Sequence, residues 1–465
     1  MRFDQFGVVV DRFKATGFLK VADQVGPWRW LVFALCVFAL GIADLRQAEG
    51  EALRKFSETA RADWEVTNIW IMAAECARKT GAWLAICQDN KLYPIANAAV
   101  ADDSGHALLL GLAARILDRP MAVVDVAKLN IAIDFVGMVC IAALLFAVRS
   151  YVASLIVLAL GGGVYLDWIA ISPHPGLIGA ASFAAVLPST IVLAERGYLS
   201  KTAKVTFLTA GAILFGMATL LREPFGTMGV IISLGALAFL GWQTRNRQQW
   251  FGLLLLLLLV IVSWQTPRWV FLARDIAFSM PPTNQIQTHG TSHNLYLGLG
   301  AIENKFGIEW SDSVGGQAVA KVDPKVAYAS HDYFRILWRV YFERLAEDPL
   351  EVARIYATKG VSMLGYQLPP KSLPLWLVVV GTVGLLIVGW RWRLWQKVNY
   401  GQAPVLLSVG LAFVGFFLLQ GTVAHHSVGY AHPIGGFVLL FFAIGVELCG
   451  RVAFHSLKQA QESAM

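Results

Sequence analysis

Charged residues are scarce in this chain. Of its 465 residues, 15% are charged and 57% are hydrophobic. A water-soluble protein typically carries about 25% charged residues, so the composition argues against one and predicts an integral membrane protein. The formal net charge is +7, but there is no dense basic stripe, which argues against nucleic-acid binding. Cytoplasmic loops of membrane proteins carry excess Lys and Arg in any case.

Several common chemical motifs are absent as well. The sequence has no G-x-x-x-x-G-K-[ST] phosphate loop, no G-x-G-x-x-G after a strand and no C-x-x-C pair. No spacing of His and Cys matches a closed zinc site. A loosely held divalent cation, Mg²⁺ or Mn²⁺, remains compatible with the sequence, because such ions use few protein ligands and share a substrate phosphate.

Ten apolar stretches approach the length of about 20 residues that a membrane span needs. They lie at 28–43, 129–148, 151–170, 176–194, 204–221, 226–242, 250–264, 374–390, 404–420 and 431–449. We therefore expect an all-α polytopic membrane protein with about ten transmembrane helices and two helical loop domains outside. The expected parts are an N-terminal segment 1–27, a module 28–264 with loop 44–128, a loop domain 265–373, C-terminal helices 374–449 and a tail 450–465.

The basic residues of the short loops predict the orientation. On one side these loops carry Arg149, Arg196, Lys201, Lys204, Arg245, Arg247, Arg391, Arg393 and Lys397. On the other side, the short loops near 171–175, 222–225 and 421–430 hold only Arg222. The positive-inside rule then places both termini in the cytoplasm of a bacterial inner membrane and both long loops in the periplasm. A cleaved signal peptide is the alternative for the first stretch, because Gly41-Ile42-Ala43 resembles a cleavage site.

The long loops carry helical patterns of their own. The stretch 61–86 mixes aromatic and basic residues and predicts helices lying at the membrane interface. The stretch 331–364 predicts two amphipathic helices broken at Pro349, whereas HGTSH at 289–293 predicts a turn. On one continuous helix Cys76 and Cys87 would lie about 16 Å apart, too far for a disulfide. A helix break at Gly81 would bring them together in an oxidising periplasm.

Polar residues collect on the predicted outer side, which holds eight of the nine histidines. His174, His425 and His426 stand in short connections at span ends, where polar groups tend to mark a cavity. Arg222 and Glu223 also lie at an outer span end. Arg222 there either grips a phosphate in bidentate fashion or reaches toward lipid headgroups.

The outer stretch 290–312 combines His293-Asn294 with aromatic and acidic residues. This mixture suits sugar recognition, because sugar rings stack on aromatic faces while hydroxyl groups need hydrogen bonds. The alternative is a structured loop that packs on the membrane.

The stretch ADDSGHALLLGLAARILDR, residues 101–119, places two acids at the start of an apolar helix. Asp102 or Asp103 would cap that helix favourably. A cap needs only one acid, so the other would be free to act as a base or a metal ligand, with His106 beside it.

The same stretch carries a family resemblance. The layout of one span, an acid-bearing outer loop, interfacial helices and further spans resembles the GT-C class of membrane glycosyltransferases. Residues 102–150 resemble the part of the bacterial protein O-mannosyltransferase-like families in which an acidic His-Pro-Pro-Leu-type motif opens a juxtamembrane helix. Asp102 or Asp103 takes the acidic place, and Gly105-His106 replaces the prolines.

The resemblance also implies a reaction and further candidate acids. These families carry an Asp-Glu pair after the first span; this chain offers Asp44, Glu49 and Glu51 without such a dipeptide. The implied reaction moves a sugar from a polyprenyl-phosphate donor to a lipid or glycan acceptor at the periplasmic face. A carboxylate would act as base on the acceptor hydroxyl, and Arg222 or a divalent cation would stabilise the departing phosphate.

Other function classes remain open. An O-antigen ligase-like or polymerase-like enzyme also carries a His-Asn in a large outer loop, as His293-Asn294 would provide, but usually lacks a long acidic first loop. A secondary transporter would need internal repeats and helices broken at mid-membrane. Gly161–Gly163 and Pro188 would permit a broken helix, yet no repeat is visible. A non-catalytic scaffold is the remaining interpretation.

Overall fold

The computed structural model describes residues 28–59, 64–89, 91–95, 104–169, 177–244, 247–281, 290–368, 373–426 and 428–464. The chain divides into two compact units, residues 1–47 and 48–465. The described part of the first unit belongs to α3 (Trp28–Thr59), which continues into the second unit. Apart from α3, the features described below belong to the second unit.

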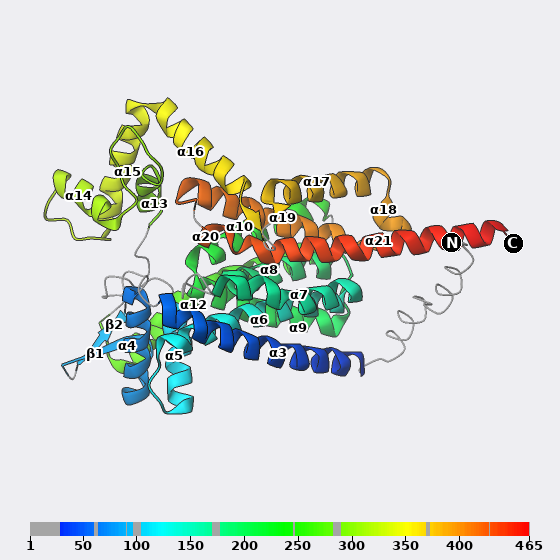
Figure 1. Ribbon diagram of the computed structural model, residues 1–465, viewed down its shortest axis with the longest axis horizontal. Helices are drawn as coiled ribbons and strands as arrows, with labels where there is room; N and C mark the ends of the chain where they lie inside the picture. The colour runs from blue at the N-terminus through cyan, green and yellow to red at the C-terminus, as the bar shows by residue number, and fades with distance from the viewer. Residues whose placement is uncertain are drawn as a thin grey trace. The chain divides into compact units, whose positions relative to one another are not determined.

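Apolar helices dominate the fold (Figure 1). They are α6 (Val123–Ala147), α7 (Tyr151–Ile169), α8 (Leu177–Glu195), α9 (Lys201–Leu221), α10 (Glu223–Gln243), α11 (Arg247–Trp264), α17 (Leu375–Arg391), α19 (Ala403–Val423) and α21 (Ile434–Ala464). Helix α12 (Thr266–Phe278) follows α11, and the short helices α18 (Leu394–Lys397) and α20 (Val428–Ala431) lie before α19 and α21.

Seven helices in the described residues are long and apolar enough to cross a membrane: α6, α8, α9, α10, α11, α19 and α21. Each of the ten stretches expected to span contributes to a helix, the other three being α3, α7 and α17, whose described apolar parts are shorter. The helical membrane-type fold is therefore confirmed, while the number of ten spans stays a prediction.

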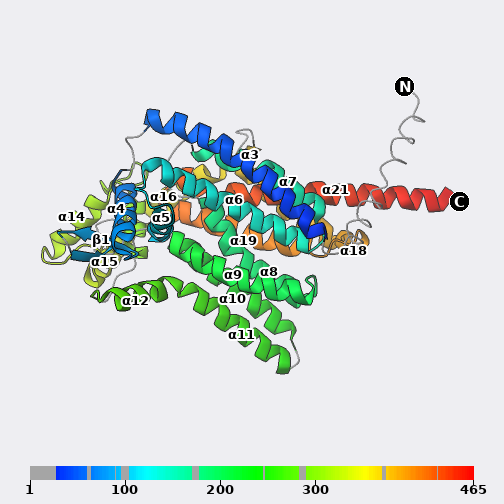
Figure 2. The ribbon, with the colours of Figure 1, turned by 90° about the horizontal axis from the view of Figure 1, so that it is seen from below.

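The apolar helices pack side by side (Figures 1 and 2). Helix α6 contacts α7 and α8, α8 contacts α9 and α10, and α21 contacts α7. These helices carry apolar residues on most faces, as expected of elements buried among other helices or in lipid. Helix α7 runs unbroken through Gly161–Gly163, and α8 runs unbroken through Pro188.

The first loop region contains α4 (Trp64–Thr80), a hairpin of β1 (Ala85–Gln88) and β2 (Lys91–Pro94), and α5 (Ser104–Leu117). The two helices lie against each other through small residues such as Ala74, Ala77 and Ala114, all of them buried. The antiparallel hairpin pairs Ala85 with Pro94 and Gln88 with Lys91. The expectation of helix up to residue 86 is thus wrong beyond Thr80.

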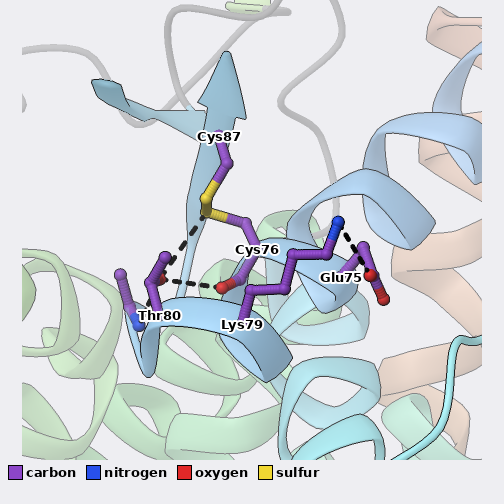
Figure 3. The surroundings of a disulfide bond; sticks show 6 residues. Glu75, Cys76, Lys79, Thr80 and Cys87 are labelled. Carbon is purple, nitrogen blue, oxygen red and sulfur yellow. Dashed lines mark hydrogen bonds and ion pairs between the residues drawn. A yellow bond between two sulfur atoms is a disulfide. The ribbon is translucent and has the colours of Figure 1, made fainter. Parts of the chain in front are cut away.

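A disulfide joins the end of α4 to the hairpin (Figure 3). Gly81, with φ of +80°, ends the helix in the left-handed region that glycine adopts readily. The turn brings the Cα atoms of Cys76 and Cys87 to 5.2 Å. The helix break at Gly81 is therefore the alternative that the structure selects.

The second loop region holds α13 (Thr291–Gly298), α14 (Asp312–Val322), α15 (His331–Glu347) and α16 (Pro349–Leu364), followed by a short β3 (Gln367–Leu368) and β4 (Leu373–Pro374). The expected break at Pro349 is confirmed, because Asp348 caps α16 by accepting from the backbone N–H of Glu351 at 3.0 Å. The turn expected around HGTSH is wrong for residues 291–293, which begin α13.

Candidate functional site

The first turn of α5 buries His106 in a polar site between α4 and α6. We call this site, with Trp70 and Asn130 around His106, the His106 corner. The His106 ring is 1% exposed and stacks on Trp70 of α4, with ring centres 4.5 Å apart. Its Nε2 atom lies 3.1 Å from Oδ1 of Asn130 on α6. Because the ring is held on its face and at its edge, its orientation is fixed.

A second polar residue follows one turn further along α6. Asp134 is 1% exposed, and its Oδ1 accepts the backbone N–H of Gly179 at 2.7 Å. Gly179 lies in the first turn of α8, where unpaired N–H groups and the helix dipole favour a carboxylate. Asp134 therefore caps α8 from a neighbouring helix, a contact that no local sequence signal announces.

Arg222 and Glu223 lie beside the same corner. Arg222 is an extended residue between α9 and α10, and both side chains are half-buried. The start of α5 approaches the end of α9 so closely that a Cβ on Gly105 would come within 2.8 Å of the backbone of Leu220 and Leu221. This close approach, which only glycine permits, brings the segment of His106 next to the segment of Arg222.

The candidate acids lie largely outside the described residues. Asp102 and Asp103 are outside them, as is His174, although both acids directly precede Ser104, the first residue of α5. Asp44, Glu49 and Glu51 lie on α3, where the structure describes the backbone but not these side chains. In the sequence, therefore, two acids directly precede the helix turn that carries His106.

His293 belongs to a different cluster, inside the second loop region. Its ring is 1% exposed, with Nδ1 2.9 Å from the Tyr333 hydroxyl and Nε2 3.1 Å from Oδ1 of Asp312. Burial raises the pKa of Tyr333, so its hydroxyl stays protonated. Both ring nitrogens of His293 are engaged within one group of helices, whereas Asn294 is half-buried on the next position of α13.

Besides the Asp312 carboxylate, aromatic side chains lie around His293. The ring of Tyr328 meets His293 edge-on, with centres 6.1 Å apart. Tyr333 also belongs to the hydrophobic core that joins α13, α14, α15 and α16. These contacts place His293 in the packing of the loop domain, and sugar recognition by the stretch 290–312 stays a prediction.

Lys359 fastens this domain to the end of α19. The Lys359 side chain is fully buried, and Nζ donates to the carbonyl oxygens of Gly298 at 2.7 Å, Val423 at 2.9 Å and Ala424 at 3.0 Å. Burial lowers the pKa of Lys359 to about 7. The three carbonyl groups come from α13 and α19, so one side chain links three helices.

His425 and His426 follow directly after this attachment point. Their rings stack with centres 5.4 Å apart, and His425 also lies 5.1 Å from Trp310. Burial and the nearby Lys359 lower the pKa of both histidines. At neutral pH both rings are therefore uncharged, and they contribute to the contact between the loop domain and α19.

Metal binding has a limited basis in the part of the chain that the structure describes. Within those residues, no group of three or more His, Cys, Asp or Glu is arranged to hold a metal ion. The expectation of a shared Mg²⁺ or Mn²⁺ thus depends on acids outside that part, Asp102 and Asp103 above all, and stays a prediction.

Comparisons with protein-family models, with curated proteins and with solved structures find no match to this chain. Of the predicted site residues, the structure brings together the segments of His106 and Arg222–Glu223, and it places His293 and His425–His426 in and beside the loop domain.

Proposed function

We propose that the protein is a membrane glycosyltransferase that takes a sugar from a polyprenyl-phosphate donor and transfers it to a lipid or glycan acceptor. The observation that carries the proposal is the close packing of Gly105 against Leu220 and Leu221. It brings the buried His106 next to the segment of Arg222, and in the sequence two acids directly precede the helix turn that carries His106. Ionisable residues gathered in such surroundings usually serve substrate chemistry.

Each of these residues would have a separate role in the transfer of the sugar. Arg222 would bind the donor phosphate, because a guanidinium group matches phosphate oxygens in bidentate geometry. Asp102 or Asp103 would take the proton of the acceptor hydroxyl as its oxygen bonds to the anomeric carbon. The bond from that carbon to the phosphate oxygen breaks, and Arg222 stabilises the negative charge of the leaving phosphate. His106, held by Trp70 and Asn130, would position the segment that carries the two acids.

The periplasmic location of this corner is part of the proposal. The short-loop charges favour that orientation. The bond between Cys76 and Cys87 adds independent support, because disulfides form and persist in oxidising compartments. The hairpin beside α4 and α5 would then lie outside the cytoplasm, on the side where Arg222 was predicted.

The alternative functions have weaker physical support. A ligase-like reaction at His293 would need a ring nitrogen that can reach substrate, yet both nitrogens have partners inside the loop domain. A transporter would use broken helices at mid-membrane, whereas α7 and α8 are continuous in the described residues. Glycosyl transfer is therefore the function that we favour.

The test compares three proteins purified in nanodiscs: wild type, Arg222→Ala and Arg222→Lys. With a polyprenyl-phosphate sugar as donor and a membrane lipid extract as acceptor source, we expect wild type to release polyprenyl phosphate in an acceptor-dependent manner. Arg222→Ala should lose roughly 100-fold in rate, as expected when one stabilising donor is removed. The lysine variant should recover only part of the loss, since it keeps the charge without the planar fork.

Arg247→Ala, at the start of α11, serves as the matched control for loss of one arginine. Activity of Arg222→Ala within twofold of wild type would make Arg222 a lipid anchor. Substrate flux in proteoliposomes without release of polyprenyl phosphate would favour a transporter.

A further inference from the structure

A large cavity opens at the far end of the bundle from the His106 corner. Its volume is about 940 Å³, and its wall includes Val192 near the end of α8, whereas Gly179 at the His106 corner lies near the start of that helix. Thirteen residues of helix separate the two positions, which corresponds to about 20 Å. The cavity is therefore distinct from the site described above.

Apart from Ser408, the residues of α10 and α19 that line the cavity are apolar. Ile232 and Phe239 of α10 face it from one helix, and Val405, Val409 and Ala412 of α19 face it from another. Positions 405 to 412 extend about 10 Å along α19. This length and composition suit a hydrocarbon chain lying between helices.

The rim is basic and aromatic. Arg196, Arg391 and Arg393 line it, together with Trp390 and Trp395. Arg391 ends α17, and Arg393 adopts a left-handed backbone with φ of 52° in the tight turn that joins α17 to α18. Arginine and tryptophan together are typical of the level at which lipid headgroups lie.

The charge of the rim is not balanced within the described residues. No carboxylate there pairs with Arg391 or Arg393, and Arg196 donates to the neutral amide of Gln243 at 2.8 Å. Glu195, the acid adjacent to Arg196, already pairs with Lys204 at 2.7 Å. Three arginines without an acidic partner would attract an anionic group.

We infer that this cavity binds a membrane lipid with an anionic phosphate headgroup, the phosphate at Arg391, Arg393 and Arg196 and one acyl chain between α10 and α19. The positive-inside rule accounts for basic residues in a loop, but it does not require an apolar chamber beneath them. The occupant is a lipid rather than a soluble phosphate, because the rim alone would satisfy a soluble anion and would leave the apolar wall uncovered.

The experiment titrates purified full-length protein with phosphatidylglycerol in neutral detergent and counts bound lipid by native mass spectrometry. Wild type should retain one lipid preferentially over phosphatidylcholine. Arg391→Ala/Arg393→Ala should weaken retention about 30-fold, since one basic side chain near an anionic surface contributes about fivefold. The control Lys201→Ala/Arg247→Ala removes the same charge outside the cavity and should retain the lipid.

A second variant tests the chain-binding wall without changing charge. Ala412→Phe should fill part of the cavity and reduce retention, and glycerol phosphate should fail to displace the lipid. If the control variant lost bound lipid to the same extent, the binding would be general charge attraction, and the proposal would be overturned. Full retention by Ala412→Phe, or displacement by glycerol phosphate, would equally exclude a lipid between α10 and α19. None of these outcomes depends on glycosyl transfer.

Discussion

His106 and His293 are both buried and both hydrogen-bonded, yet their surroundings differ. The partners of His293 lie within the loop domain, on α14 and α15, and each of its ring nitrogens has one. His106 is held between α4 and α6 and begins a helix that packs against the half-buried Arg222–Glu223 segment. The difference teaches that a buried histidine alone does not mark a site. A functional site is indicated more strongly where separate segments of the chain meet beside a half-buried charged residue.

The largest expected effect concerns the two acids that precede α5. Asparagine caps a helix about as well as aspartate but cannot accept a proton. At least one of Asp102→Asn and Asp103→Asn should therefore insert and melt normally yet lose about 100-fold or more in turnover. Asp312→Asn, beside His293, should keep nearly full activity.

The donor-release assay described for Arg222, run together with thermal unfolding, measures both properties. Full activity in both of the Asp102 and Asp103 variants would assign the pair to helix capping. Asp44, Glu49 or Glu51 on α3 would then become the better candidate for the base. Loss of activity in Asp312→Asn alone would reverse the comparison between the two histidine clusters.

A smaller effect, on stability, is expected from replacing Lys359, which links the loop domain to the end of α19. Lys359→Met leaves three buried carbonyl groups without their donor, so we expect the free energy of unfolding to fall by about 2–3 kcal/mol. Hydrogen exchange should increase at the end of α19 and in α16, while the first turn of α5 stays protected. Lys321→Met, on the surface of α14, is the control. Equal exchange in both variants would show that Lys359 does not hold the domain.

The smallest expected effect is a pH dependence of the stability, caused by His425 at the point where the loop domain contacts α19. Because the pKa of His425 is lowered in the folded protein from its usual 6.5, the unfolded chain binds more protons as the pH falls below that value. The free energy of unfolding is thus unaffected by this group above pH 6.5. It declines on acidification, and His425 accounts for less than about 1.4 kcal/mol of that decline per pH unit. Unfolding temperatures between pH 7 and pH 5 should fall less in His425→Phe; an identical slope would exclude His425 as the titrating group.

The sequence predicts the parts of this fold that depend on local signals. Apolar runs mark the bundle helices, and Pro349 with the preceding Asp348 marks the boundary between α15 and α16. Strands β1 (AICQ) and β2 (KLYP) have four residues each, and neither alternates strictly between apolar and polar residues, so the sequence carries no clear strand signal there. The Gly-Thr-Ser segment before His293 resembles a turn although Thr291 begins α13, whose packing against α15 outweighs that local preference.

Tertiary contacts account for what the sequence does not reveal about the site. Asp134 lies within an apolar stretch, and its role as the cap of α8 depends on a residue 45 positions away. Lys359 resembles an ordinary lysine of an amphipathic helix until its three carbonyl partners are known. By contrast, Arg222 is recognisable in the sequence as the single basic residue of the short loops that are predicted to lie outside.

Photolabelling tests the central claim most directly. A polyprenyl phosphate bearing a photoreactive group near the phosphate would be bound to the purified wild-type protein, irradiated and located by peptide mapping. We predict label in the peptides that contain Arg222 and the start of α5, and its loss when unlabelled polyprenyl phosphate is in excess. Label confined to residues 290–364, or label that unlabelled lipid does not displace, would contradict the assignment of the His106 corner as the donor site.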